Sequence, residues 1–164
     1  MKEEWTRIVV ADSVDSPGVR FPPPFVYAGA VLGGYLLDRG WPLPFGDGRW
    51  WEVVAAILVV GWAVLTISSF GHFWRRRTTI IPNRPANALV VAGPYRFTRN
   101  PLYLALALLT SALAIVLNTW WPVVLLVPAL VIIRLTVIAP EESYLRRRFG
   151  AEYEAYMRRV RRWI

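Results

Sequence analysis

Three long stretches with almost no charge limit the folds open to this chain. Val53–Phe70 and Leu102–Leu117 contain no charged residue, and Trp121–Ala139 contains only Arg134. A helix needs roughly 20 mostly apolar residues to cross the hydrocarbon core of a bilayer. Inside lipid the backbone must satisfy its own hydrogen bonds, which a helix does within one segment. The three stretches therefore predict transmembrane helices.

A fourth apolar run, Phe25–Leu37, is shorter and reaches spanning length only if Asp38 and Arg39 lie at the interface. Pro140 is expected to end the last span, and Glu141–Ile164 is expected to form a polar helix after it. The predicted fold is all-α: a polytopic membrane protein with about four transmembrane helices and a C-terminal amphipathic cytoplasmic helix. Residues 1–164 are expected to form a single domain.

The basic residues predict the orientation of these helices. The segment from Gly71 to Asn100 contains six Arg and no acid, whereas the loop Gly40–Gly48 contains no basic residue. The positive-inside rule then places both termini and the central segment in the cytoplasm, with residues 1–24 as a cytoplasmic segment that lacks a signal-peptide pattern. The expected aromatic belts are Trp41, Trp50, Trp51, Trp120 and Trp121 outside and Trp5, Trp74 and Trp163 inside.

Composition narrows the classes of function. A net charge of +8 is compatible with nucleic-acid binding, but the basic residues flank apolar runs and so favour a membrane protein over a nucleic-acid partner. The absence of Cys excludes disulfides and thiolate sites, and the single His72 cannot build a zinc site, so no metal site is expected. Lys2 is the one Lys among 19 basic residues, which is typical of a GC-rich bacterial genome.

The tail after Pro140 has a hydrophobic stripe at helical spacing, and Gly150 is expected to break its helix after Phe149. The main interpretation is a helix lying on the anionic inner leaflet, and covering a nearby site is compatible with that role. The residues of the stripe are Leu145, Phe149, Tyr153, Tyr156, Val160 and Trp163.

A polar motif, Gly93-Pro94-Tyr95-Arg96-Phe97-Thr98-Arg99-Asn100-Pro101-Leu102-Tyr103, lies between two apolar stretches. Each member has an ordinary explanation. Gly93 can form a turn or allow close approach to a ligand, Asn100 and Pro101 suit the first positions of a helix, and Tyr103 can anchor at the interface. Polar groups at a membrane edge are costly, so the cluster as a whole is a candidate site.

Glu141 and Glu142 follow the fourth span and could simply favour the start of the last helix. Beside an Arg-rich surface, they could instead hold a cation or ribose hydroxyls. Arg134 lies seven residues before Glu141, two helical turns away, so both are expected on one face. Arg134 would then pair with a carboxylate or hold an anionic ligand group.

The order of these motifs resembles the isoprenylcysteine carboxyl methyltransferase family and the related phospholipid methyltransferases. The family pattern Arg-His-Pro-x-Tyr-x-Gly, followed by Glu-Glu after a helical hairpin, is similar to Arg99-Asn100-Pro101-x-Tyr103 followed by Glu141-Glu142. Leu89-Val90-Val91-Ala92-Gly93-Pro94-Tyr95 and Phe149-Gly150-Ala151-Glu152-Tyr153-Glu154-Ala155-Tyr156 also look like family segments. The similarity covers roughly 71–164.

The resemblance implies S-adenosylmethionine as methyl donor, a cofactor-binding half over 71–164 and a lateral opening for a lipophilic acceptor. Arg99 would suit the donor's carboxylate, and Glu141 or Glu142 its ammonium or hydroxyls. The cofactor-binding residues carried over are Gly93, Tyr95, Arg99, Asn100, Pro101, Tyr103, Glu141 and Glu142. Membrane lipids are the expected partners.

Three departures from the family pattern leave the acceptor open. Asn100 replaces a His and cannot carry charge, Ala105 replaces a Gly, and Val53–Phe70 lacks the Arg that the carboxyl methyltransferases have in that helix. A carboxylate or thiolate acceptor needs no general base, whereas an amine or hydroxyl does, and His72 or a glutamate is then the candidate. His72 and Arg134 are the candidate catalytic residues. The alternative function is a non-enzymatic four-span membrane scaffold or lipid-binding protein.

Overall fold

A computed structural model of the chain describes residues 22–76 and 89–163, with side chains for 22–72 and 89–163. The described elements are all helical: α1 (Pro23–Gly40), α2 (Arg49–Arg76), η1 (Gly93–Arg96), α3 (Pro101–Val116), α4 (Trp121–Ile133), η2 (Arg134–Ile138) and α5 (Ala139–Arg159). The all-α prediction is confirmed for these residues. The predictions for Trp5, Trp74 and nearly all of 1–24 lie outside the described side chains.

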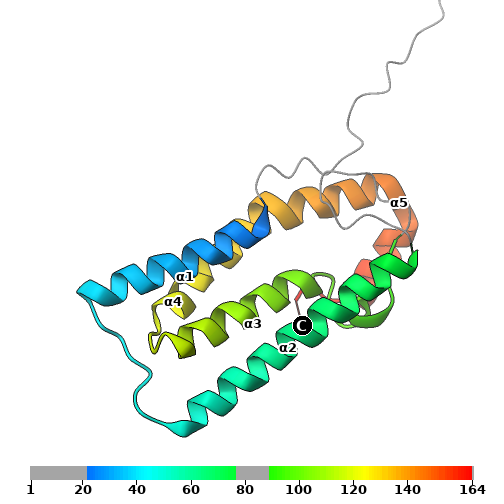
Figure 1. Ribbon diagram of the computed structural model, residues 1–164. Coiled ribbons are helices and arrows are strands. Elements are labelled where there is room, and N and C mark those ends of the chain that lie inside the picture. The colour runs from blue at the N-terminus through cyan, green and yellow to red at the C-terminus, as the bar shows by residue number, and fades with distance from the viewer. Residues whose placement is uncertain (1–21, 77–88, 164) are drawn as a thin grey trace, which may run out of the picture.

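The helix α3 occupies the middle of a bundle, in contact with α1, α2 and α4 (Figure 1). Its buried face consists of small residues, which let neighbouring backbones approach closely, as is usual between membrane helices. Those residues are Ala105, Ala107, Thr110, Ala112 and Ala114. The same device joins α1 to α4, because a Cβ on Gly34 would lie 2.5 Å from the backbone nitrogen of Pro122.

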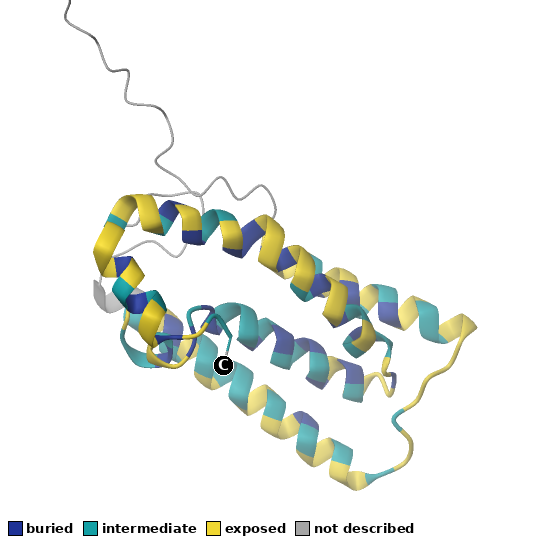
Figure 2. Ribbon diagram, turned by 180° about the vertical axis from the view of Figure 1, so that it is seen from behind, coloured by how far each residue is buried: buried dark blue, intermediate teal, exposed yellow. Residues whose placement is uncertain are grey.

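The outer surface of the bundle is apolar, because many large hydrophobic side chains are exposed on it. Figure 2 shows exposed positions along the outward faces of the long helices. On α2, for example, Ile57, Val60 and Ile67 are 65%, 61% and 72% exposed. Apolar helix faces of this extent are stable in lipid rather than in water.

In the part of the chain that the structure describes, two helical segments are long and apolar enough to cross a membrane: Arg49–His72, and a continuous helix that starts at Trp121. The other two expected spans fall short by this measure. α3 has 16 residues, about 24 Å at 1.5 Å per residue, and α1 ends in Asp38, Arg39 and Gly40. The structure therefore supports two of the four predicted spans, and the crossings by α1 and α3 stay predictions.

Pro140 does not end the fourth helix, which corrects the sequence prediction. The chain stays helical from α4 through the π-helical turn η2 into α5. A proline ring in a regular α-helix clashes with the carbonyl four residues earlier. Here the wider π-turn comes immediately before Pro140 and gives the ring room, with the Ala139 N–H donating to the Arg134 carbonyl five residues back.

Gly150 bends α5, as predicted, with φ of +49° and ψ of −123°. The helix ends at Arg159 rather than at Ile164, because Val160 is extended. The hydrophobic stripe of α5 packs inside the protein: Tyr153, Tyr156 and Val160 form a buried cluster with Leu89 against it. The stripe therefore does not face the leaflet, and the leaflet-lying interpretation is wrong for this face.

Candidate functional site

The site is built where α3 begins. η1 enters it through Gly93, whose φ of +62° belongs to the left-handed region that glycine adopts without strain. A Cβ at Gly93 would collide with the imidazole of His72, so the turn packs directly on α2. His72 Nδ1 lies 2.7 Å from the Ser68 carbonyl oxygen. A carbonyl only accepts, so Nδ1 carries the proton and Nε2 is the basic nitrogen.

The C-terminal segment returns to this point, as Figure 1 shows for the chain end beside the start of α3. The Arg99 backbone N–H donates to the Arg161 carbonyl at 3.0 Å. The Arg162 carbonyl accepts from Thr98 Oγ1 at 3.1 Å and from Asn100 Nδ2 at 2.9 Å. Three bonds from one loop therefore hold the tail against the candidate site.

Asn100 occupies the N-cap position of α3 but makes no side-chain capping bond. Its amide is used instead to hold the Arg162 carbonyl. Neither of the two roles considered from the sequence, capping or ligand contact, describes this bond. Pro101 is the first residue of α3, as expected, because its fixed φ suits that position and it has no N–H to leave unpaired.

Glu142 is the centre of an ion-pair cluster. Arg162 donates to it through two nitrogens, Nε to Oε1 at 2.9 Å and Nη2 to Oε2 at 2.7 Å. Arg99 Nη1 lies 3.1 Å from Oε1, and the Glu142 side chain is 9% exposed. Burial opposes its ionisation, but the hydrogen bonds from Arg162 and the charge of Arg99 outweigh burial and hold the pKa of Glu142 below its ordinary value.

Glu141, the preceding residue, has no such cation among the described side chains. Tyr103 Oη lies 2.9 and 3.0 Å from its two carboxylate oxygens and donates to them. Burial raises the pKa of Glu141 to about 7, with the Tyr103 hydrogen bond acting in the opposite direction and the charge of Glu142 adding to the rise. Glu141 is therefore a partly buried carboxylate that is hydrogen-bonded to a neutral hydroxyl.

Tyrosines surround the Glu141 end of the site. Tyr27 Oη donates to the Tyr103 backbone carbonyl at 3.0 Å, which joins α1 to the start of α3. The Tyr95 carbonyl accepts from Tyr156 Oη at 2.7 Å. Burial and then the nearby charge of Glu141 raise the pKa of Tyr95, so its hydroxyl stays neutral. The carboxylate of Glu141 thus lies among neutral phenols.

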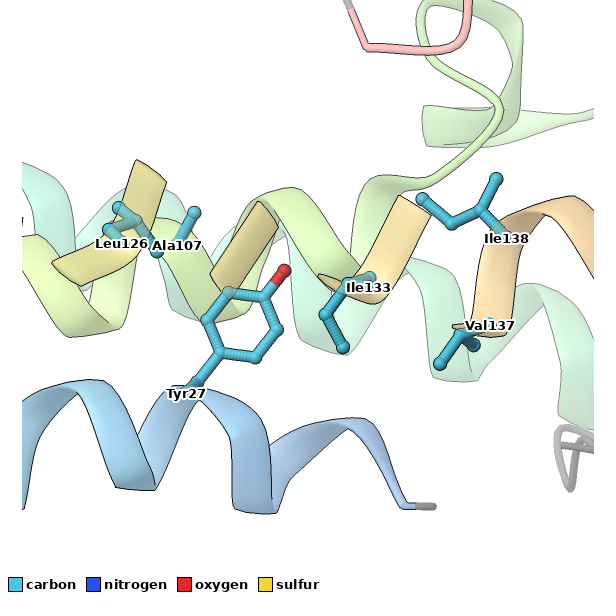
Figure 3. Close-up of a cluster of buried hydrophobic side chains, with 6 residues drawn as sticks. All are labelled: Tyr27, Ala107, Leu126, Ile133, Val137 and Ile138. Carbon is cyan, nitrogen blue, oxygen red and sulfur yellow. The ribbon is translucent and has the colours of Figure 1, made fainter. Parts of the chain in front are cut away.

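A buried hydrophobic cluster supports this end of the bundle from below. Figure 3 shows Tyr27 from α1 pointing toward Ile133, with Val137 and Ile138 from η2 beside it. Tyr103 and Trp163 pack against the same cluster. The π-turn η2 therefore belongs to the hydrophobic cluster that packs against Tyr103 of the site.

Arg134 does not join the site, contrary to the expectation from its spacing. Its side chain is exposed, and no ion pair links it to Glu141 or Glu142 among the described side chains. The cause is η2, which inserts one extra residue into the turn between them. Such an insertion rotates the later residues by roughly 100° relative to a regular helix, so the two-turn argument fails.

The structure brings the other predicted residues together on η1, the loop after it, the start of α3 and the start of α5, and His72 joins them. They are Gly93, Tyr95, Arg99, Asn100, Pro101, Tyr103, Glu141 and Glu142. Sequence reasoning missed Arg162, Thr98 and Tyr27. Arg162 is one of several Arg in the tail, and nothing in its spacing distinguishes it. Its role comes from the bend at Gly150, which returns the tail to α3.

An apolar groove of about 600 Å³ runs between α1 and α3. Tyr27 and Leu106 lie on its wall near the site, and Tyr35 and Leu117 lie at the far end. Thr110 contributes one of its few polar groups. Because Tyr27 also bonds to Tyr103, one end of this groove adjoins the residue that holds Glu141.

Comparison with known proteins gives one family and one relative. A family model described as phospholipid methyltransferase matches residues 50–152. The cobalt-zinc-cadmium resistance protein CzcN of Cupriavidus metallidurans is 31% identical over 128 residues, 72% of this chain and 54% of that protein. The chain thus spans about half the length of this relative. No solved structure shows significant similarity to the chain.

Proposed function

Since the chain belongs to the phospholipid methyltransferase family, we propose that it transfers a methyl group from S-adenosylmethionine to a lipidic or small hydrophobic acceptor. The reaction would take place at the cytoplasmic face of a bacterial membrane, with α1 to α4 spanning the bilayer. The observation that carries the proposal is the contrast between Glu141 and Glu142. Glu142 is bound by two Arg, while Glu141 is partly buried against a tyrosine hydroxyl, with no cation paired to it among the described side chains.

The chemistry of the donor fits this arrangement. S-adenosylmethionine supplies an activated methyl group on a sulfonium, and it also carries an ammonium, a carboxylate and a ribose diol. A buried carboxylate among aromatic rings favours a cationic group, because burial strengthens attraction to its charge and ring faces attract cations. Glu141, with Tyr95 and Tyr103, would therefore hold a positive part of the donor. Gly93 would allow its close approach to the backbone.

Arg99 and Asn100 have a supporting part in this proposal. Arg99 pairs with Glu142 and Asn100 bonds to the tail, so their main effect is to hold Glu142, Arg162 and the start of α3 in place. Positioning of this kind matters because methyl transfer is an in-line displacement, which depends on orientation. Well-oriented reacting groups can reach effective molarities of order 10⁵ M or more.

The groove between α1 and α3 is the proposed path of the acceptor's apolar part. Its walls are almost entirely hydrocarbon, and one end adjoins Tyr103. An acceptor lying there would present its reactive end near Glu141. If that end is an amine or hydroxyl, His72 Nε2 or Glu141 would take the proton. A thiolate or carboxylate would need no base.

Ligand titration of two adjacent variants tests the proposal. In detergent, Glu141→Gln should bind S-adenosylmethionine and its demethylated product at least tenfold more weakly, about 1.4 kcal/mol, without a fall in unfolding temperature. Glu142→Gln should instead lower the unfolding temperature, because it removes a charge that two Arg share. Calorimetry and thermal unfolding give the two readouts.

Glu152→Gln is the matched control, because it removes an exposed carboxylate from the same helix. It should change neither the affinity for S-adenosylmethionine nor the unfolding temperature. Wild-type protein that binds neither ligand would favour the non-enzymatic scaffold or lipid-binding function. Unchanged affinity in Glu141→Gln would remove this residue from the donor site. Labelled-methyl transfer into lipid and small-molecule extracts would then identify the acceptor.

A further inference from the structure

A second pocket, distinct from the groove and the Glu141 end of the site, lies in the bend of α5. Its volume is about 410 Å³, and its walls are Arg99, Arg146, Glu154, Met157 and Arg158. Arg146 comes from the part of α5 before Gly150 and Arg158 from the part after it. The bend brings the two parts together, and Arg146 Nη2 lies 3.6 Å from Met157 Sδ.

The charges on the pocket walls do not balance. Three Arg face one acid, Glu154, across this volume. Among the described residues, the other nearby acid is Glu142, and Arg162 already donates two hydrogen bonds to it. A concave surface lined by charges of one sign concentrates counter-ions of the opposite sign. The pocket therefore favours an anion.

Arg99 forms the inner wall, and its guanidinium is incompletely used. Its Nε and Nη1 are buried with no hydrogen-bond acceptor among the described residues. Nη1 lies 3.1 Å from Glu142 Oε1, which is an ion-pair distance, but the contact does not meet hydrogen-bond geometry. Buried donors without an acceptor are costly, so an incoming oxygen ligand would be favoured here.

We propose that this pocket binds a phosphate group. Guanidinium groups match phosphate oxygens through planar pairs of N–H donors, and several Arg around one concavity are typical of phosphate recognition. The phosphate could belong to the headgroup of an anionic phospholipid or to a free phosphate compound. The site does not depend on methyl transfer, so its test is separate from that of the donor site.

The test uses the full chain in neutral detergent, titrated with inorganic phosphate at constant ionic strength, and the same protein mixed with phosphatidylcholine vesicles with or without phosphatidylglycerol. Arg146→Gln and Arg158→Gln should each weaken saturable phosphate binding at least fivefold. Arg147→Gln is the matched control, because it removes an equal charge one residue away, from a side chain bonded to Ser143. It should change binding less than twofold.

Removing an acid from the pocket should have the opposite effect on phosphate binding. Glu154→Gln should strengthen phosphate binding, whereas Glu152→Gln, outside the pocket, should not. Variant-sensitive binding to phosphatidylglycerol alone would identify a lipid headgroup as the ligand, and variant-sensitive binding of inorganic phosphate would identify a soluble one. Equal losses in Arg147→Gln and Arg158→Gln, or no saturable binding in either arm, would overturn the proposal. Donor binding should persist in all these variants, which separates this result from a failure of the donor site.

Discussion

Glu141 and Glu142 are adjacent on α5 and lie in opposite electrostatic surroundings. Glu142 is neutralised by Arg162 and Arg99, and its pKa lies below the ordinary value. Glu141 is bonded to Tyr103, and burial raises its pKa to about 7. One position along a helix is a rotation of about 100°, which is enough to place neighbouring side chains in different surroundings. Glu142 is suited to hold the fold together and Glu141 to meet a ligand.

This contrast predicts how donor affinity depends on pH. If an ionised Glu141 holds a cation, affinity should rise about tenfold between pH 6 and pH 8, as the group loses its proton near 7. Calorimetric titration across that range measures it. In Glu141→Gln this rise should be absent, and any dependence that persists belongs to the ligand's own amine. The same rise in both proteins would mean that Glu141 does not face the donor.

Stability should change in the opposite direction. The pKa of Glu141 is about 7 in the folded state and near 4.5 when unfolded, so the folded protein holds this proton more tightly. The contribution of this group to stability is fully present below pH 4.5 and is lost as pH rises through 7. Thermal unfolding of the ligand-free protein should show Glu141→Gln gaining stability over wild type between pH 5 and pH 8. An equal difference at every pH would contradict this.

Asn100→Asp tests the bond to the tail. The substitution removes the Nδ2 donor and places an acceptor against the Arg162 carbonyl, so it should destabilise the protein by about 1–3 kcal/mol. The control is Asn118→Asp, because Asn118 uses its carbonyl oxygen to accept from the Phe45 N–H, and Asp keeps an acceptor there. Thermal unfolding should separate the two. Equal stability of both variants would show that the amide bond is unimportant.

At the scale of elements, two local irregularities shape the site. The π-turn η2 rotates the start of α5 relative to α4 and lets the helix pass through Pro140. The bend at Gly150 then reverses α5, so that its last residues reach the loop before α3. Without either irregularity, Arg162 would not meet Glu142. The site therefore depends on departures from regular helix.

Gly150→Ala should damage this arrangement. The φ and ψ of Gly150 lie in a region that residues with a Cβ rarely adopt, at a cost of about 1–3 kcal/mol. The variant should unfold at lower temperature and show faster amide exchange in the tail, since a straightened α5 cannot reach Arg99. Gly71→Ala, in α2 with open space around it, should be neutral or slightly stabilising. Unchanged exchange in the Gly150 variant would show that α5 tolerates a Cβ there.

At the scale of the molecule, polar and aromatic ends enclose an apolar middle. The turns at the end opposite the site are tied by aromatic contacts: Phe45 stacks on Trp120 at 4.1 Å, and Trp121 Nε1 donates to the Trp41 carbonyl at 2.7 Å. Trp residues at such a position are typical of a membrane interface. The Arg-rich site end would then face the cytoplasm.

Cysteine labelling tests this orientation directly, because the chain has no native Cys. Asp47→Cys, exposed in the loop between α1 and α2, should react with an impermeant maleimide in intact cells. Glu152→Cys, exposed on α5, should react only after lysis. Tags at both termini should be protected in intact cells. Opposite accessibility of the two termini would mean that α1 does not cross the membrane.

The sequence by itself determined the helical class and most, but not all, of the residues at the candidate site. Runs of apolar residues predict helices because few other structures satisfy the backbone in lipid, and Gly150 predicts a bend because it breaks helical preference locally. Gly93, Asn100, Tyr103 and Glu141 were all recognisable, since each departs from the apolar pattern around it. Each of these predictions depends only on a residue and its neighbours along the chain, which the sequence gives directly.

Only the tertiary structure decided how these residues are paired. The spacing of Arg134 and Glu141 predicted a shared face, but η2 rotates one relative to the other. The partner of Glu142 is Arg162, twenty residues later, and it becomes a partner only because α5 bends back. Which of two adjacent glutamates is neutralised depends on where distant segments come to lie. That depends on packing across the whole bundle, which no spacing within the sequence specifies.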